Sequence, residues 1–163
     1  RLRYEISKIV NIDPRNVHAY ILGEHGDSEF VCWSSANIGA KSISDVINDM
    51  DEISFSDLDK IYVKVRDAAY EIIKRKKATY YGVGMALVKI TTAIFNNENR
   101  ILPISVLNNG VYDCEDEVYI GLPSVVNRDG VHHIVKLELS DDEKLKLQKS
   151  ATILRNSLES IGY

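Results

Sequence analysis

Residues 101–139 read ILPISVLNNGVYDCEDEVYIGLPSVVNRDGVHHIVKLEL, and this segment decides the fold because it alternates apolar runs with turn residues. The runs are rich in Val and Ile, which favour strands. Between them stand NNG at 108–110 and NRDG at 127–130, whose residues tolerate the tight backbone geometry of turns. Short β-rich runs at this spacing are typical of hairpins. We therefore predict an antiparallel sheet in this segment.

Amphipathic helices are predicted on either side of this sheet. Ser54 and Ser56 each precede an aspartate by three residues, which is typical of a helix N-terminus. Apolar residues then recur at helical steps, at Leu58, Ile61, Val65, Ala68 and Ile72. After the sheet, Ser140 and Glu143 form a capping-box pattern. The apolar face of the helix that follows consists of Leu147, Ala151, Leu154 and Leu158.

A further helix is predicted at residues 81–95, whose apolar residues share one face: Val83, Leu87, Ile90 and Ile94. Two glycines and an alanine in this segment are small enough for another backbone to approach closely. We therefore expect this helix to be buried. Thr79 falls at its junction with the preceding helix, where the residues alone suggest a structural role.

The N-terminal part predicts shorter elements. Residues 1–10 show the apolar spacing of a helix, and strands are predicted at 17–22 and 29–33, joined by a loop. Residues 34–53 give no clear assignment. Taken with the sheet and the long helices, this order predicts one domain over residues 1–163 with an α+β fold, in which antiparallel strands pack against long helices.

The loop around His25 is where the sequence points to chemistry. Residues 18–30, HAYILGEHGDSEF, place this histidine at the end of an apolar strand, between two glycines that permit a tight turn. An imidazole changes charge near neutral pH, and Glu24 and Asp27 are close enough in sequence to influence that change. Such a histidine can serve as a general acid or base, or it can merely cap a turn.

Composition narrows the classes of partner. The chain has 163 residues, 20 of them basic and 24 acidic, with a net charge of -4. Because it has no basic arm and no apolar run of roughly 18 residues, we expect neither a nucleic-acid nor a membrane partner. Cys32 and Cys114 fit the reduced thiols of a cytoplasmic protein. We predict no metal site, and we expect His132 and His133 to alternate across a strand, one in solvent and one in the core.

Several motifs are absent from the sequence. It contains no G-x-G-x-x-G, no Walker-type loop and no alternation of strands and helices, so we do not expect it to bind a dinucleotide by itself. It also lacks the G-x-S-x-G elbow of hydrolases. Its first residues already have helical periodicity and no initiating Met, so we expect the chain to be part of a longer protein.

Four segments resemble bacterial L-lactate dehydrogenases, of the lactate/malate dehydrogenase family. NVHAYILGEHGDSEFVCWSSANIG at 16–39 is similar to the active-site segment of these enzymes. The segments KKATYYGVGMALVKITTAIFNNEN, VYIGLPSVVNRDG and LSDDEKLKLQKSA are similar to those that follow it. The resemblance covers essentially the whole chain, in order. It implies the C-terminal, substrate-binding half of an enzyme whose Rossmann half, which binds NAD, lies upstream.

The resemblance implies roles for three residues in the reduction of pyruvate to lactate. His25 matches the histidine that donates a proton to the ketone oxygen and accepts one from lactate in reverse. Arg1 matches the arginine of the D-x-x-R motif, which clamps the substrate carboxylate. Thr79 matches a threonine of the substrate pocket, which replaces the structural role suggested above. The aspartate that orients the histidine precedes Arg1 in the family, so we expect Asp27 to fix the loop rather than to orient His25.

The resemblance also implies regulation and assembly. Arg3 and His18 fall at the positions of a basic pair that binds fructose 1,6-bisphosphate between subunits in the activated bacterial enzymes. Arg1 and Arg3 are two positions apart on a helix, so they point to different sides. Enzymes of this family form homotetramers, and self-association is expected here as well.

Two other interpretations stay open. The chain could be the corresponding half of a malate dehydrogenase or another 2-hydroxyacid dehydrogenase, because the loop that selects the substrate lies upstream. It could also be a non-catalytic interaction or assembly domain in which His25 only shapes a loop. On the preferred interpretation, the isolated chain is inactive because it lacks the cofactor-binding half and the orienting aspartate.

Overall fold

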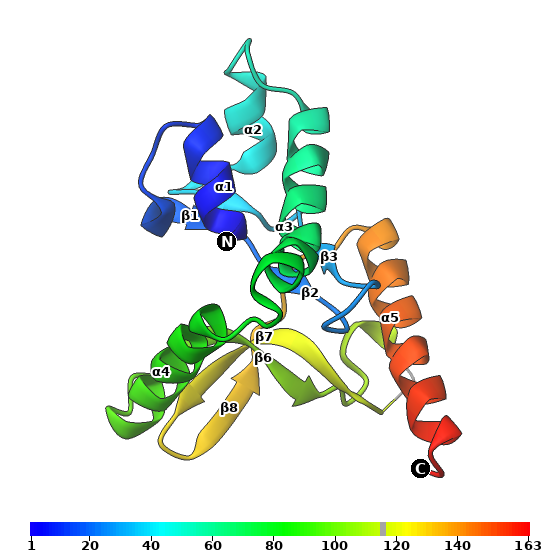
Figure 1. Cartoon of the computed structure of the whole chain (residues 1–163). Helices are drawn as coiled ribbons and strands as arrows, with labels where there is room; N and C mark the ends of the chain where they lie inside the picture. Colours follow the sequence, from blue (N-terminus) through cyan, green and yellow to red (C-terminus); the bar gives the residue numbers. More distant parts are fainter. Residues whose placement is uncertain (115–116) are drawn as a thin grey trace. The chain divides into compact units, whose positions relative to one another are not determined.

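The computed structural model describes residues 1–114 and 117–163, which form two compact units (Figure 1). The first unit comprises Arg1–Tyr20 and Val31–Thr79, and the second comprises Ile21–Phe30 and Tyr80–Tyr163. Both units contain helices and strands, and the strand pairs within them are antiparallel. The predicted α+β fold class is therefore confirmed.

The first unit combines helices with a small sheet. Its helices are α1 (Leu2–Ile9), α2 (Ile43–Asn48) and α3 (Phe55–Lys76), with a short 3-10 turn η1 (Pro14–Asn16). Its sheet has the order β1-β4-β5 and consists of β1 (Val17–His18), β4 (Asn37–Ile38) and β5 (Lys41–Ser42). The helix predicted within residues 1–10 and the one predicted to begin near Ser54 are thus confirmed. The segment 34–53, which had no clear assignment, contributes β4, β5 and α2.

Both ends of helix α3 are set by local features of the chain, side-chain hydrogen bonds at its start and a left-handed backbone conformation at its end. The Ser54 main-chain N–H and hydroxyl both donate to Oδ2 of Asp57, at 3.0 and 2.8 Å. These bonds satisfy groups that a helix N-terminus leaves without partners. At the other end, Lys77 has a φ of 67°, in the left-handed region that a helix cannot continue through.

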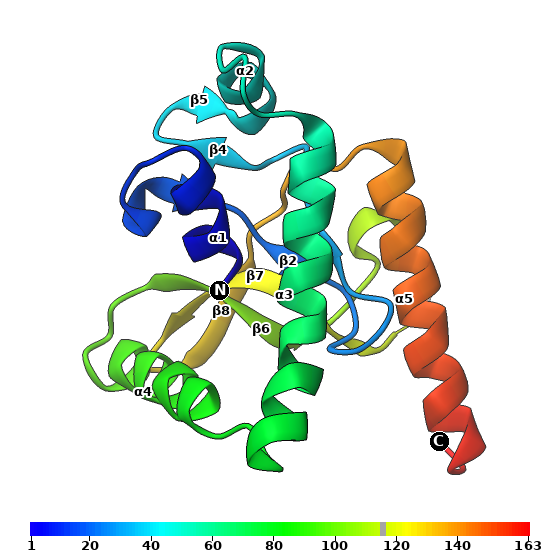
Figure 2. The same cartoon turned by 45° about the horizontal axis from the view of Figure 1, so that its top comes forward.

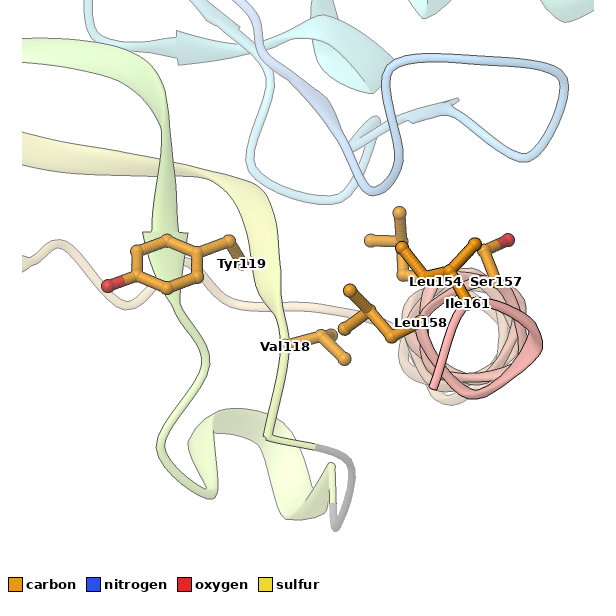
Figure 3. Close-up of a pocket in the computed structure, with 6 residues that line it drawn as sticks. All are labelled: Val118, Tyr119, Leu154, Ser157, Leu158 and Ile161. Atoms are coloured by element: carbon orange, nitrogen blue, oxygen red, sulfur yellow. The ribbon is translucent and has the colours of Figure 1, made fainter. Parts of the chain in front are cut away.

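Helix α1 lies beside α3 (Figure 2). Apolar residues are buried on both helices, at Leu2, Ile6, Leu58 and Ile61. At the edge of this contact, Nζ of Lys64 lies 2.7 Å from Oε2 of Glu5. The apolar contact and the ion pair together fix α1, which carries Arg3 and follows directly on Arg1.

The second unit is organised on an antiparallel sheet with the order β6-β7-β8. Its strands are β6 (Arg100–Leu107), β7 (Tyr119–Asn127) and β8 (Gly130–Ile134). Ile104 pairs with Leu122 and Ser124 with Ile134, which confirms the predicted hairpins. The last strand ends at Ile134 rather than at residue 139. A 3-10 turn η2 (Val111–Asp113) lies between β6 and β7.

Helix α5 (Asp141–Ser160) packs against β7. The predicted capping box is present, because the Ser140 hydroxyl accepts from the Glu143 N–H at 3.3 Å and Oε2 of Glu143 accepts from the Ser140 N–H at 3.0 Å. Leu147 and Ala151 are completely buried at 0% exposure. The same helix face carries Ser150 into the core, also at 0% exposure.

Helix α4 (Tyr81–Phe95) forms as predicted, but the prediction that it is buried is wrong. Ala93 is its buried residue, whereas Tyr81, Met85 and Leu87 are 73, 60 and 57% exposed. The helix contacts β7 beside the sheet (Figure 1). The apolar pattern indicates a face that is suited to burial. It does not show whether this chain or another molecule buries that face.

The predicted strand over residues 17–22 is also corrected, because it divides into β1 and β2 (Ile21–Leu22), which pair in different sheets. Strand β1 pairs with β4, whereas β2 pairs with β3 (Phe30–Val31). The predicted loop between two paired strands is therefore confirmed. The chain changes partner between residues 18 and 21, which a pattern of alternating side chains cannot reveal.

Candidate functional site

His25 lies in a bend between β2 and β3, and the base of this loop is fixed to the central sheet of the second unit. Gly23 and Gly121 exchange two backbone hydrogen bonds, of 3.1 Å from the Gly23 N–H and 3.0 Å from the Gly121 N–H. Gly23 has a φ of 100°, which residues with a side chain rarely adopt. The loop thus begins at a fixed point two residues before the histidine.

Polar contacts hold the loop itself. The Glu24 N–H donates to Oγ of Ser150 on α5 at 2.6 Å. Ser150 Oγ lies 2.9 Å from Oγ of Ser28, and the Ser28 hydroxyl donates to Oε2 of Glu24. Neither serine was predicted from the sequence to belong to the site. Ser150 gives no local signal, because it stands 126 positions after Glu24.

The His25 side chain projects fully into solvent. Oε2 of Glu29 lies 3.8 Å from its Nδ1 and belongs to a side chain that is only 14% exposed. Glu24 and Asp27 are the neighbours of the imidazole that the sequence predicts. Glu29 was not predicted, although its i,i+4 spacing from His25 was the available signal. An exposed imidazole beside a half-buried carboxylate can exchange a proton with a molecule that approaches from solvent.

The predicted basic residues Arg1, Arg3 and His18 all belong to the first unit. Arg1 is exposed at the N-cap of α1, and its carbonyl accepts from the Glu5 N–H at 3.0 Å. Arg3 is half-buried, with its guanidinium carbon 5.4 Å from the centroid of the Tyr20 ring. This distance is within the range of a cation–π contact. His18 is exposed on β1, two residues before Tyr20.

Charges near α1 lower the pKa of the Glu5 carboxyl below its ordinary value. The hydrogen bond from Lys64 is the main cause, and it outweighs the opposing effect of burial. The charges of Lys64, Lys8 and Arg1 act in the same direction as this bond. Glu5 therefore serves as a fixed negative charge on the helix that carries Arg3.

Thr79 is exposed at the junction between α3 and α4, as predicted. It is the last residue of the first unit, whereas His25 belongs to the second. The structure thus places Arg3 in contact with Tyr20, which follows His18 by two positions in the sequence. It holds the His25 loop through hydrogen bonds to Gly121 and Ser150.

His132 and His133 are both exposed, so the prediction that one of them lies in the core is wrong. Their Nδ1 atoms lie 2.7 Å apart on β8. The register of β8 against β7 shifts at this point, since Val125 pairs with His133 and Val126 with Val131, so the simple alternation of faces does not hold. Over residues 1–114 and 117–163, no three His, Cys, Asp or Glu side chains gather in a way that could hold a metal ion. In the same ranges no helix is long and apolar enough to cross a bilayer.

An exposed histidine on a loop that is held by hydrogen bonds is an arrangement compatible with general acid–base catalysis. Comparison with known proteins identifies the family. Residues 1–162 match the model described as lactate/malate dehydrogenase, alpha/beta C-terminal domain. The chain therefore belongs to the lactate/malate dehydrogenase family, as its C-terminal domain.

Curated relatives and solved structures agree with this assignment. The chain is 47% identical over 161 residues to an L-lactate dehydrogenase 2 of Bacillus cereus, covering 99% of this chain and 51% of the relative. A lactate dehydrogenase, MGS-M5, from a deep-sea metagenome library of the Medee basin is 76% identical, with a TM-score of 0.96 over 99% of this chain and 52% of that one. The minor L-lactate dehydrogenase of Enterococcus mundtii, in its ligands-bound form, is 44% identical, with a TM-score of 0.92 over 98 and 51%. The chain spans about half the length of the curated relatives it matches.

Proposed function

We propose that this chain is the catalytic half of an NAD-dependent L-lactate dehydrogenase, which interconverts pyruvate and L-lactate. The observation that carries the proposal is His25, fully exposed on a loop whose base is tied to the sheet. The family membership and the relatives named L-lactate dehydrogenase support the substrate. Because the chain spans about half of those relatives, the activity belongs to the full-length protein.

In this proposal His25 gives a proton to the ketone oxygen of pyruvate and takes it back from the hydroxyl of lactate. Arg1 binds the substrate carboxylate through the two parallel hydrogen bonds that a guanidinium can donate. Thr79 contributes to the substrate pocket, and Asp27 fixes the loop rather than orienting His25. Holding the substrate in this way removes part of the entropic barrier to reaction.

The hydride comes from NADH, which a Rossmann half upstream of this chain is proposed to bind. This chain's own helices do not fit the dinucleotide's pyrophosphate, which prefers a helix N-terminus free of negative charge. Acidic residues occupy the first turns of α1, α2, α3 and α5, namely Glu5, Asp45, Asp57, Asp141, Asp142 and Glu143. Helix α4 has no acidic residue there, yet it follows another helix rather than the strand and glycine-rich loop of a dinucleotide site.

The full-length protein tests this proposal through its oxidation of NADH with pyruvate and with oxaloacetate. We expect a clear preference for pyruvate, and His25→Asn is expected to lower kcat by about 10²- to 10⁴-fold. His132→Asn, which changes an exposed histidine on β8, is the matched control and is expected to leave kcat unchanged. A preference for oxaloacetate would identify a malate dehydrogenase instead.

The non-catalytic alternative has its own test. An assembly domain predicts no dinucleotide-binding motif in the codons before Arg1 and no turnover with either substrate. We expect instead a G-x-G-x-x-G after a strand and an aspartate three residues before Arg1. The 163-residue chain alone is expected to be inactive, so NADH-dependent turnover by it would contradict the proposal.

We also propose activation by fructose 1,6-bisphosphate, bound by Arg3 and His18 between subunits. The exposure of His18 and the stacking of Arg3 on Tyr20 support this assignment, because both leave a basic side chain near the surface of the first unit. The exposed apolar side chains of α4 support a homo-oligomer, which we propose is a tetramer. We also propose a cytoplasmic location, because a chain with two cysteines, Cys32 and Cys114, fits a reducing compartment better than a secreted disulfide framework.

A further inference from the structure

Three polar groups close a ring of hydrogen bonds beneath the His25 loop. The Glu24 main-chain N–H donates to Ser150 Oγ at 2.6 Å, and Ser150 Oγ lies 2.9 Å from Ser28 Oγ. The Ser28 hydroxyl donates to the Glu24 carboxylate. The ring thus starts and ends on Glu24, the residue immediately before the histidine.

The direction of each bond in the ring follows from the number of protons available. A serine hydroxyl has one proton to donate. Ser28 gives its proton to the Glu24 carboxylate, so the bond between the serines must be donated by Ser150. Ser150 therefore accepts from the Glu24 N–H and donates to Ser28. Every bond runs in the same sense around the ring, an arrangement in which hydrogen bonds strengthen one another.

Ser150 is the fixed member of this ring. It is completely buried on α5, next to the core residue Ala151, whereas Ser28 and Glu24 are half-buried in the loop. It also limits the space at the root of the loop, because a Cβ on Gly23 would lie 2.8 Å from its hydroxyl oxygen. A side chain locked by helix packing is the kind of support that holds a functional group in place.

We propose that Ser150 is a positioning residue for His25, and that it acts through the ring it forms with Glu24 and Ser28. This inference rests on the proposed function. The ring fixes the main chain on one side of His25, and the Gly23–Gly121 bridge fixes it one residue earlier. The exposed imidazole then has its freedom limited to its own side-chain rotations. Proton transfer depends steeply on such placement, since an error of about 1 Å can lower a rate 10²-fold.

Ser150→Ala in the full-length protein tests the proposal by kinetics. We expect kcat and kcat/KM for pyruvate to fall together by about 10- to 100-fold, because the bond serves the transition state rather than substrate binding. Ser150→Cys is expected to be intermediate, since sulfur is a weak acceptor. The matched control is Ser157→Ala on the same helix, which removes an exposed hydroxyl bonded to the Ile153 carbonyl at 2.9 Å and is expected to leave kcat unchanged.

Amide hydrogen exchange gives a second readout that does not depend on activity. In Ser150→Ala, exchange is expected to accelerate in residues 23–28 and to stay unchanged in the rest of α5 and in β7. A general loss of stability would instead accelerate exchange throughout the second unit. Should Ser150→Ala fail to fold, Ser28→Ala opens the same ring from the loop, and we expect the same confined acceleration and the same loss of kcat.

The outcomes separate this proposal from the proposed function. Unchanged exchange in residues 23–28 overturns the inference, and so does faster loop exchange with an unchanged kcat. If the unmodified full-length protein does not reduce pyruvate, the proposed function fails on that measurement alone. The exchange experiment then still decides whether Ser150 holds the loop, and the catalytic part of the inference falls with the function.

Discussion

Gly121 and Gly23 lie so close that each main chain supplies both a donor and an acceptor to the other, at 3.0 and 3.1 Å. A Cβ on Gly121 would come within 2.8 Å of the Gly23 carbonyl oxygen, which belongs to backbone and cannot turn aside. The position therefore requires glycine for reasons of space. The loop that carries His25 and the central strand of the sheet are joined through this contact.

Gly121→Ala is accordingly expected to separate the loop from β7 and to destabilise the chain by about 1–3 kcal/mol, the usual effect of overfilling a packed site. Thermal and denaturant unfolding measure this effect. Gly84→Ala is the control. Gly84 is a helical glycine, and a Cβ added to it would meet no atom within 4 Å. This variant is expected to be neutral or to stabilise by about 0.5–1 kcal/mol. Equal stability of the two variants would show that the close approach is relaxed in solution.

Asp57 makes the start of α3 sensitive to acid. Hydrogen bonds from Lys60 and Ser54 lower the pKa of this carboxyl to about 2. Because the folded state holds the proton less tightly than the unfolded chain, where the pKa is about 3.9, the stabilisation is complete above that value. It is lost as the pH falls through about 2. Between about pH 4 and pH 2 we expect the amide protection factors of residues 54–58, which correct for the intrinsic exchange rate at each pH, to fall. Asp57→Asn is expected to remove this pH dependence.

Activation by fructose 1,6-bisphosphate is expected to depend on Arg3 and His18. Replacing both with glutamine in the full-length protein removes the two basic side chains, and the ratio of kcat/KM with and without the bisphosphate is expected to fall to about one. Arg15→Gln is the control, because that exposed arginine is already engaged by Asp13, 2.9 Å away. Activation that persists in the double variant would refute the assignment of the pair.

The exposed face of α4 is expected to be covered by another subunit in the full-length protein. Leu87→Glu places a charge on this face and is expected to shift the assembly to smaller species in analytical ultracentrifugation. Leu145→Glu on α5 is matched to it, since the two leucines are 57 and 64% exposed. We expect this second variant to keep the mass of the unmodified protein. An unchanged mass for Leu87→Glu would exclude α4 from the subunit contacts.

The elements that could be predicted from the sequence are those with strong local signals. The capping pattern at Ser140 and the turn residues at 127–130 mark helix α5 and the β7–β8 hairpin, and both form as predicted. The break between β1 and β2 could not be predicted, because it arises when the chain moves from one sheet to another. The exposure of α4 had no local signal either, since the same apolar pattern serves a core and an interface.

The residues of the candidate site also differ in whether a local signal predicts them. His25 could be singled out because glycines and carboxylates surround it within a few residues. Glu29 follows His25 by four positions and Ser28 follows Glu24 by four, so the i,i+4 spacing could have indicated both. Ser150 was not, because only the packing of α5 brings it to the loop. Roles that depend on a contact made late in the chain leave no trace in the sequence around the histidine.

The 126 positions between Glu24 and Ser150 have a consequence for how the protein is made. A ribosome adding about 5–20 residues per second needs roughly 6 to 25 s to synthesise that interval. Throughout this time the histidine loop lacks the Ser150 hydroxyl that closes its ring. A chain released before residue 150 therefore contains the His25 loop and lacks the serine hydroxyl that closes its ring of hydrogen bonds.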